Sequence, residues 1–144
     1  MEKELILLVG PIGSGKTTFA ETLANETSIR ISQDEMGRKA YLEHFKAAIR
    51  DGIPRIIIDR MSFNNEQRDR FIKPARDAGY CVTVFEFKLS RDICFDRALN
   101  RKNHPTIGNN PKDINGVLNF YYNNYEPVDL NIIDNYNEIN HEGY

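Results

Sequence analysis

Residues 10–17 read Gly-Pro-Ile-Gly-Ser-Gly-Lys-Thr, which is a complete G-x-x-x-x-G-K-[ST] phosphate-binding loop. The loop follows the apolar stretch Leu5–Val9, which is typical of a buried strand, and it precedes residues 18–25, which can form a helix. A strand in front and a helix behind are the context that this motif requires. The alternative is an ordinary glycine-rich turn, and the context favours phosphate binding over it.

The residue types of the loop explain how it would bind a nucleotide. Glycines let several backbone N–H groups converge on one anion, and the following helix adds its positive N-terminal end. We expect the Lys16 ammonium to reach the β- and γ-phosphates and the Thr17 hydroxyl to coordinate Mg²⁺. The residues expected to contact ATP or GTP are Gly10, Ile12, Gly13, Ser14, Gly15, Lys16, Thr17, Thr18, Arg97 and Arg101.

Length and charge limit the alternatives. The 144 residues suit one domain, spanning residues 1–144, and the net charge of −2 gives no overall field that would attract nucleic acid. A nucleic-acid partner would need a local basic surface. Two runs could supply one, and the alternative for each is a solvated helix face. The first run is Arg68, Arg70, Lys73 and Arg76, and the second is Arg97, Arg101 and Lys102.

The two cysteines, Cys81 and Cys94, are expected to be buried, which fits a reducing compartment. No Cys/His spacing indicates zinc. The charged start of the chain and its short first apolar stretch do not resemble a signal peptide or a membrane span. We therefore expect a cytoplasmic protein, in the host cell if the source is viral, with no membrane partner. The sequence gives no signal for an oligomeric state.

Apolar runs and helical patterns alternate along the chain, which predicts an α/β fold with a parallel sheet covered by helices on both faces. Ligands bind at the carboxyl ends of the strands in such sheets. The Asn- and Tyr-rich segment from Asn119 onward is interpreted as a compositional bias without function. The expected strands are 5–9, 29–32, 56–59, 81–87 and 130–134, and the expected helices are 16–25, 35–51, 65–78 with a kink or restart at Pro74, one behind an N-cap at Ser90 to about 101, and 111–124.

Asp34 follows the second expected strand and is a candidate general base. Transfer of a phosphoryl group to a hydroxyl needs an acceptor for its proton, and an aspartate can serve. Asp34 could equally be an N-cap of the next helix, and Glu35 could be an exposed acid of its first turn. Arg38, one helical turn later, could reach the same cleft or form an ion pair with Asp34.

Asp59, at the end of the third strand, is in the position of a Walker-B carboxylate. It could bind the metal through water or orient the acceptor, and the alternative is a cap for the turn at 62–65. Arg97 and Arg101 are four residues apart on one helix face that leads into the loop 102–111. Arginines at the base of such a loop are typical of a lid over transferring phosphates, here at about 97–115.

The chain resembles the P-loop polynucleotide 5′-kinases, the kinase half of bacteriophage and animal end-healing enzymes, over nearly its whole length. The resemblance rests on six stretches. They are the loop 10–17, Ser32–Arg38 with its Asp, Ile58–Asn64, the Arg-rich helix Gln67–Ala78 followed by Gly79, Arg97–Arg101, and Ile114–Pro127. The family implies a P-loop NTPase three-layer sandwich with a five-stranded parallel sheet in the order 2-3-1-4-5. It also implies a small helical lid.

The resemblance implies roles for individual residues. Asp34 matches the general base that activates the 5′-hydroxyl, and Arg38 matches an arginine that contacts the neighbouring phosphate of the acceptor. Arg101 matches the lid arginine on the donor phosphates, which makes Lys16, Asp34 and Arg101 the expected catalytic residues. The chain departs from the family at residues 60–62, which read Arg-Met-Ser, and no D-x-D-x-T phosphatase motif is present.

The leading hypothesis is transfer of the ATP γ-phosphate, with Mg²⁺, to the 5′-hydroxyl end of DNA or RNA. Asp34, Arg38 and Asp59 would contact this substrate, and Thr17 would bind Mg²⁺ with Asp34 or Asp59, directly or through water. One alternative is a P-loop kinase of a small metabolite or nucleoside. Another is a nucleotide-binding module without phosphotransfer.

Overall fold

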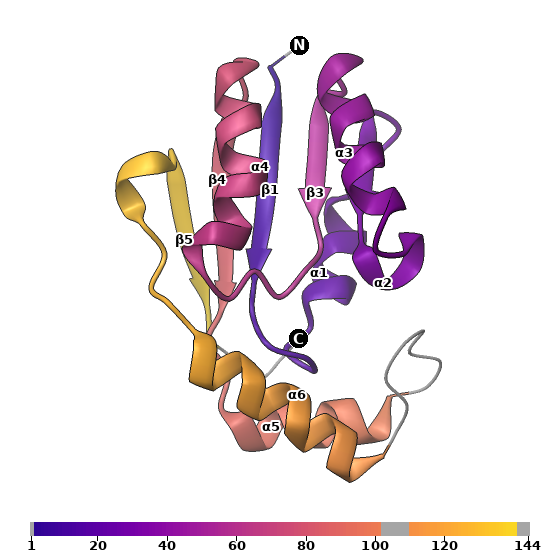
Figure 1. Cartoon of the computed structure of the whole chain (residues 1–144), viewed down its shortest axis with the longest axis vertical. Coiled ribbons are helices and arrows are strands. Elements are labelled where there is room, and N and C mark those ends of the chain that lie inside the picture. The colour runs from indigo at the N-terminus through magenta and orange to yellow at the C-terminus, as the bar shows by residue number, and fades with distance from the viewer. Residues whose placement is uncertain (1, 102–109, 141–144) are drawn as a thin grey trace.

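The computed structural model describes residues 2–101 and 110–140, with only the backbone of Asp34 and Glu35. Its centre is a parallel sheet in the order β2-β3-β1-β4-β5 (Figure 1). This order and the fold class confirm the prediction. The strands are β1 (Glu4–Val9), β2 (Ser28–Ile31), β3 (Arg55–Ile58), β4 (Cys81–Phe87) and β5 (Asn135–Ile139).

Helices cover both faces of this sheet (Figure 1). On one face, Phe45 of α3 and Phe71 of α4 pack with alternate strand residues such as Leu7 and Val84. On the other face, Phe19 of α1 packs with Ile6. The helices are α1 (Lys16–Leu23), α2 (Gln33–Met36), α3 (Ala40–Arg50), α4 (Asn65–Asp77), α5 (Arg91–Asn100) and α6 (Pro111–Asn124), with the 3₁₀ helix η1 at Leu130–Ile132.

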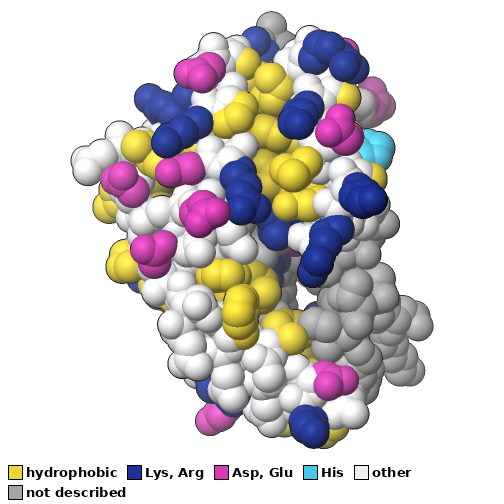
Figure 2. Space-filling view, viewed as in Figure 1, with side chains coloured by type: hydrophobic (Ala, Val, Ile, Leu, Met, Phe, Trp, Pro, Cys, Tyr) yellow, Lys and Arg dark blue, Asp and Glu magenta, His cyan; other side chains and the backbone are white. Residues whose placement is uncertain are grey.

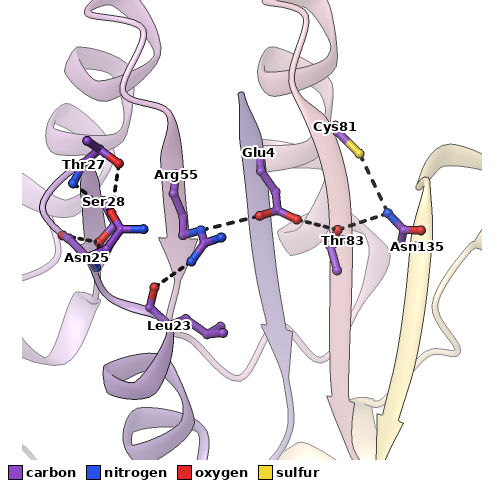
Figure 3. Close-up of polar contacts among 9 residues, drawn as sticks. All are labelled: Glu4, Leu23, Asn25, Thr27, Ser28, Arg55, Cys81, Thr83 and Asn135. Carbon is purple, nitrogen blue, oxygen red and sulfur yellow. Dashed lines mark hydrogen bonds and ion pairs between the residues drawn. The ribbon is translucent and has the colours of Figure 1, made fainter. Parts of the chain in front are cut away.

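A polar band crosses the amino ends of the strands (Figure 3). Glu4 of β1 lies between Arg55 Nε of β3, at 3.5 Å, and the Thr83 hydroxyl of β4, which donates to it at 3.1 Å. Asn135 of β5 donates to the Thr83 hydroxyl at 3.3 Å. The band pairs polar groups across four strands at the edge opposite the phosphate loop. The candidate site lies at the other edge, where the carboxyl ends of the strands meet.

Two predicted elements were wrong. The helix expected at 35–51 is divided into α2 and α3, because Gly37 adopts φ 88° and the chain leaves helical geometry there. The strand expected at 130–134 is instead η1, which Asp129 caps, and the true edge strand β5 begins at Asn135. An edge strand with only one buried residue, Ile139, lacks the apolar run that predicts a strand.

Other local predictions can be compared directly with the described residues. The Ser90 hydroxyl caps α5 by accepting from Ile93 N at 3.3 Å, as predicted. Helix α4 continues through Pro74 as one helix, so no restart occurs there. Cys94 is buried, but Cys81 is only half-buried. The loop 102–111 that was predicted as part of a lid lies largely outside the described residues.

Candidate functional site

The phosphate loop bends tightly at two glycines and packs against α5. Gly13 has φ 76° and Gly15 has φ 94°, both in the left-handed region that favours glycine. A Cβ on Gly13 would lie 2.1 Å from the carbonyl oxygen of Cys94 in α5. The loop therefore depends on glycine for its turn and also for its contact with the helix that carries Arg97.

Side chains of the loop hold its shape. The Ile12 side chain is buried with Cys94, Ala98, Ile114 and Leu118 of α5 and α6, so only the backbone of Ile12 is available to a ligand. The Ser14 hydroxyl and the Lys16 ammonium both donate to the Pro11 carbonyl, at 2.7 and 2.8 Å. These bonds place the Lys16 cation over the loop, where the motif requires it.

Helix α1 begins directly after the loop. Its N-cap is Gly15, and no side chain caps it. The first N–H groups of such a helix have no intrahelical partner and carry the positive end of the helix dipole. The loop and the start of α1 together are suited to bind phosphate.

Asp59 connects the loop to the end of β3. The Thr17 hydroxyl donates to Asp59 Oδ2 at 3.0 Å, and Arg30 NH1 of β2 lies 2.8 Å from the same oxygen. The carboxylate side chain is only 4% exposed. The helix after the following turn, α4, is capped by Asn64, which accepts from Gln67 N at 2.9 Å, and not by Asp59.

The Thr17 and Asp59 oxygens fit Mg²⁺, which prefers hard oxygen ligands and commonly uses one or two carboxylates besides phosphate oxygens. Among the side chains that the structure describes, which do not include Asp34 and Glu35, no group of three or more His, Cys, Asp or Glu could hold a metal alone. Bound there, Mg²⁺ would neutralise phosphate charge.

A pocket of about 370 Å³ adjoins this carboxylate. It lies between the segment after β3, the end of β2 and helix α6. Figure 2 shows apolar side chains over α6 on this face and Lys and Arg side chains above them. The lining residues are Gln33, Arg38, Asp59, Arg60, Met61, Ser62, Phe63, Gln67 and Phe120.

The structure brings Arg38 and Asp59 to the same pocket, although Arg38 does not lie on the helix on which it was expected. Arg38 follows α2 rather than lying one turn along it, because that helix ends at Met36 and Gly37 turns the chain. Asp34 belongs to α2, and the N-cap position of that helix is Ser32, so Asp34 is not its cap. Its backbone directly follows Gln33, which lines the pocket.

The two candidate lid arginines lie at the end of α5. Arg97 is in the last turn and Arg101 is the C-cap residue, and both are half-buried. Because α5 packs on Gly13, these arginines belong to a helix that contacts the loop. Lys102 and the chain that follows up to residue 109 lie outside the described part. The contact of Arg97 and Arg101 with a donor phosphate stays a prediction.

The first basic run does not form one surface. Arg68 is fully buried, while Arg70, Lys73 and Arg76 are exposed and each lies near a carboxylate. Arg68 Nε donates to the Ser62 carbonyl at 2.7 Å, and NH1 donates to Asn65 Oδ1 at 3.0 Å. Burial lowers the pKa of Arg68 below its ordinary value. Arg68 is therefore a structural support of the pocket wall.

A buried polar cluster lies behind that wall. Glu86 of β4 is 2% exposed and accepts hydrogen bonds from the Tyr125 and Tyr136 hydroxyls. The Arg68 guanidinium lies 5.7 Å from the centre of the Tyr125 ring. Burial, followed by the hydrogen bond to Glu86, raises the pKa of both tyrosines. The cluster ties α4, β4 and β5 together beneath Ser62.

Sequence reasoning missed Ser62, Phe63, Gln67 and Phe120 as site residues. Ser62 and Phe63 directly follow Asp59, so their position after a strand was an available signal. Phe120 lies in the segment that was attributed to biased composition. Nothing in its local pattern indicates that α6 crosses the carboxyl end of the sheet, because that contact is set by tertiary packing.

Comparison with known proteins supports the fold. Residues 5–42 match the model of a family described as an AAA domain, which is less than half of the chain. No curated protein matches the sequence. The match to the family model spans β1, the phosphate loop, α1, β2 and α2, and it therefore includes the loop motif.

Solved structures resemble the whole chain. A sugar kinase from Janibacter sp. HTCC2649 is 17% identical, with a TM-score of 0.67 over 96% of this chain and 85% of that one. Kti12 from Chaetomium thermophilum, solved with ADP-AlF3, is 15% identical, with a TM-score of 0.66 over 94% and 88%. The tunicamycin resistance protein of Deinococcus radiodurans is 20% identical, with a TM-score of 0.50 over 92% and 89%.

These likenesses show that the chain has the fold of P-loop kinases. The fold agrees with the sheet order and the loop motif. The names of these neighbours give no common acceptor, so the acceptor has to be argued from the pocket. In the described part of the chain, no helix is both long and apolar enough to cross a membrane.

Proposed function

We propose that the chain transfers the γ-phosphate of ATP to the 5′-hydroxyl end of DNA or RNA. The acceptor oxygen forms a bond to the γ-phosphorus while the bond to the β–γ bridging oxygen breaks. ADP leaves, and the proton of the hydroxyl goes to the Asp34 carboxylate. The donor phosphates would lie on residues 10–17, with Lys16 and Arg101 offsetting charge at the transferring group.

One observation carries this proposal: the pocket shares Asp59 with the phosphate loop. Asp59 accepts from Thr17 of the loop and also lines the pocket, which contains the exposed Arg38. A donor on the loop and an acceptor in the pocket would therefore meet at one carboxylate. Arginine is suited to bidentate contact with a phosphate, such as the one that follows the 5′-terminal nucleoside.

A kinase of a small metabolite is the second candidate. It is supported by the fold likeness to a sugar kinase from Janibacter, and a pocket of about 370 Å³ would accommodate a sugar or nucleoside. The exposed Arg38 at the pocket favours a phosphate-bearing acceptor over a neutral sugar. A nucleotide-binding module without transfer chemistry would need neither Arg38 nor a pocket beside Asp59.

The test is transfer of radiolabelled γ-phosphate to a matched panel of acceptors with Mg²⁺ present. The panel contains a 5′-hydroxyl DNA, a 5′-hydroxyl RNA, nucleosides and simple sugars. The same oligonucleotides with a 5′-phosphate are the control, because their acceptor hydroxyl is blocked. We expect label only on the 5′-hydroxyl oligonucleotides.

Two results would contradict the proposal. Label on sugars or free nucleosides at higher kcat/KM than on the oligonucleotides would identify a metabolite kinase. ATP binding without label on any acceptor would identify a binding module. An Arg38→Ala variant should raise the KM for the oligonucleotide, and Lys39→Ala, which changes a neighbouring exposed cation outside the pocket lining, is its matched control.

A further inference from the structure

The far wall of the pocket is aromatic. Phe120 of α6 is 52% exposed, which is unusual for so large an apolar side chain, and it lines the pocket. It stands against the buried Phe63 with ring centres 5.2 Å apart and planes at 88°. This edge-to-face contact fixes the Phe120 ring while much of its surface stays open to a ligand.

Ser62, beside that wall, has an unusual backbone conformation and a buried hydroxyl that no hydrogen bond within the described residues satisfies. Its φ of 49° lies in the left-handed region, which is costly for a residue with a side chain. Its hydroxyl is buried, with the residue 1% exposed, and has no hydrogen-bond partner among the described residues. A strained residue that places an orphan hydroxyl at a pocket is typical of a group held for a ligand.

Gln67 adds a second polar group at the same wall. Its side-chain carbonyl accepts from Phe63 N at 3.2 Å, so its amide NH₂ is the half that can meet a ligand. Ser62 and Gln67 thus offer hydroxyl and amide groups in the same pocket lining as Phe63 and Phe120. A planar ring with hydrogen-bonding groups on its edge satisfies both surfaces at once, as a nucleobase does.

The groups that line the pocket agree with one end of a nucleic acid. Asp59, which accepts a hydrogen bond from Thr17 of the phosphate loop, and Phe120 of α6 both line it. A 5′-terminal nucleotide brings a hydroxyl to the reacting phosphate and carries a base that can stack on an aromatic ring. A simple sugar has no base and would leave the aromatic wall without a partner.

We propose that the Phe63–Phe120 wall is a subsite for the base of the acceptor's 5′-terminal nucleotide. Phe120 supplies the stacking face, and Ser62 and Gln67 contact the base edge. This inference rests on the proposed function and deepens it, because it names the part of the substrate that the second half of the pocket recognises.

The test compares two acceptors of equal length and charge. One is a 5′-hydroxyl oligonucleotide with an ordinary terminal nucleotide, and the other has an abasic sugar at the 5′ end. We expect the wild-type kcat/KM to be about tenfold higher for the base-containing acceptor, which is the order of effect that one stacked base produces. Phe120→Ala should reduce this ratio to near one, and Phe120→Tyr should retain it.

Tyr122→Ala is the matched control. Tyr122 is an exposed aromatic residue on the same helix that does not line the pocket, so its loss should leave the ratio unchanged. Ser62→Ala should lower the ratio less than Phe120→Ala does. Circular dichroism of each variant would verify that α6 is intact.

The outcomes separate the two proposals. A wild-type enzyme that labels both acceptors equally well overturns the base subsite and leaves the proposed function standing. A preference that persists undiminished in Phe120→Ala overturns the assignment to this wall. Failure of the wild type to label either oligonucleotide, while it labels a sugar, overturns the proposed function and the subsite with it.

Discussion

The Thr17 hydroxyl donates to Asp59 Oδ2 at 3.0 Å, although 42 positions separate the two residues in the chain. This bond joins the start of α1 to the end of β3. Parallel strands bring their carboxyl ends to one edge, so residues from distant parts of the sequence meet there. Both predicted metal-contacting oxygens are therefore adjacent.

Replacing Asp59 with Asn should weaken the binding of Mg²⁺ at this pair of oxygens. The amide retains the shape of the side chain but removes the charge that attracts Mg²⁺. We expect the Mg²⁺ concentration for half-maximal transfer to rise about tenfold or more. The measurement is a Mg²⁺ titration at saturating ATP.

Thr17→Ala and the double variant complete this experiment. If the two oxygens share one ion, the effects of the single substitutions should not add in the double variant. Strictly additive effects would show that Thr17 and Asp59 act separately. Arg30→Lys controls for the ion pair, since Arg30 NH1 lies 2.8 Å from the same carboxylate.

Asp34→Asn should lower kcat by about a hundredfold or more while ATP binding is retained, because a general base contributes that much to proton removal. Glu35→Gln is the matched control, since it changes the adjacent carboxylate in α2. Transfer to a 5′-hydroxyl oligonucleotide and equilibrium binding of ATP are measured for both. Wild-type turnover by Asp34→Asn would remove Asp34 as the base.

The sequence was sufficient to predict the fold and the position of the phosphate loop between a strand and a helix. The loop motif, the strand before it and Asp59 are local signals, and the alternation of elements predicts a parallel sheet. The pocket beside Asp59 was harder to predict from the sequence. Phe120 reaches the pocket only because α6 crosses the end of the sheet, and a contact of that kind has no periodic signature in the chain.

Two other errors have a similar origin. Arg68 was expected to be exposed, either on a basic surface or on a solvated helix face, but α4 directs it to the interior, where it donates to the Ser62 carbonyl at 2.7 Å. Its charge gave no hint of burial because charged residues are seldom buried. β5 was misplaced because an edge strand needs few apolar residues. The half-buried Ile132 and Ile133 before it form a short apolar run of the kind that predicts a strand.

Gly13→Ala should destabilise the fold strongly. The new Cβ would lie 2.1 Å from the Cys94 carbonyl, and φ would remain at +76°. Because backbone cannot move away as a side chain can, we expect a loss of about 3 kcal/mol or more in the free energy of unfolding. Urea unfolding measures this loss.

Gly79→Ala is the control for the backbone strain alone. Gly79 has φ +85°, but nothing lies within 4 Å of a Cβ built there. Its substitution should cost about 1 kcal/mol. Equal losses for the two variants would show that the contact between the loop and α5 contributes nothing.

The tyrosine cluster predicts that stability falls in alkaline solution. Burial and the hydrogen bond to Glu86 hold the pKa of Tyr136 above its ordinary value of 10.0. Below that pH both folded and unfolded chains bind the proton. Above it the unfolded chain loses the proton while the folded chain retains it, so the free energy of unfolding decreases as pH rises.

Urea unfolding between pH 8 and pH 11 tests this prediction. In Tyr136→Phe the decrease above pH 10 should be shallower, because one of the retained protons is gone. The variant should also be about 1 kcal/mol less stable at pH 8, since Glu86 loses a buried hydrogen bond. An unchanged slope above pH 10 would contradict the role given to Tyr136.

Ser62→Gly should change stability and activity in opposite directions. Glycine adopts φ 49° without strain and leaves no buried hydroxyl unpaired, so the free energy of unfolding should rise by up to about 1 kcal/mol. The same change removes a proposed contact with the acceptor, so kcat/KM for the 5′-hydroxyl oligonucleotide should fall. Thermal unfolding and transfer assays on one preparation measure both. If Ser62 adopted this conformation only to stabilise the fold, its substitution would lower the free energy of unfolding. A fall in both the free energy of unfolding and kcat/KM would therefore mean that Ser62 serves the fold rather than the substrate.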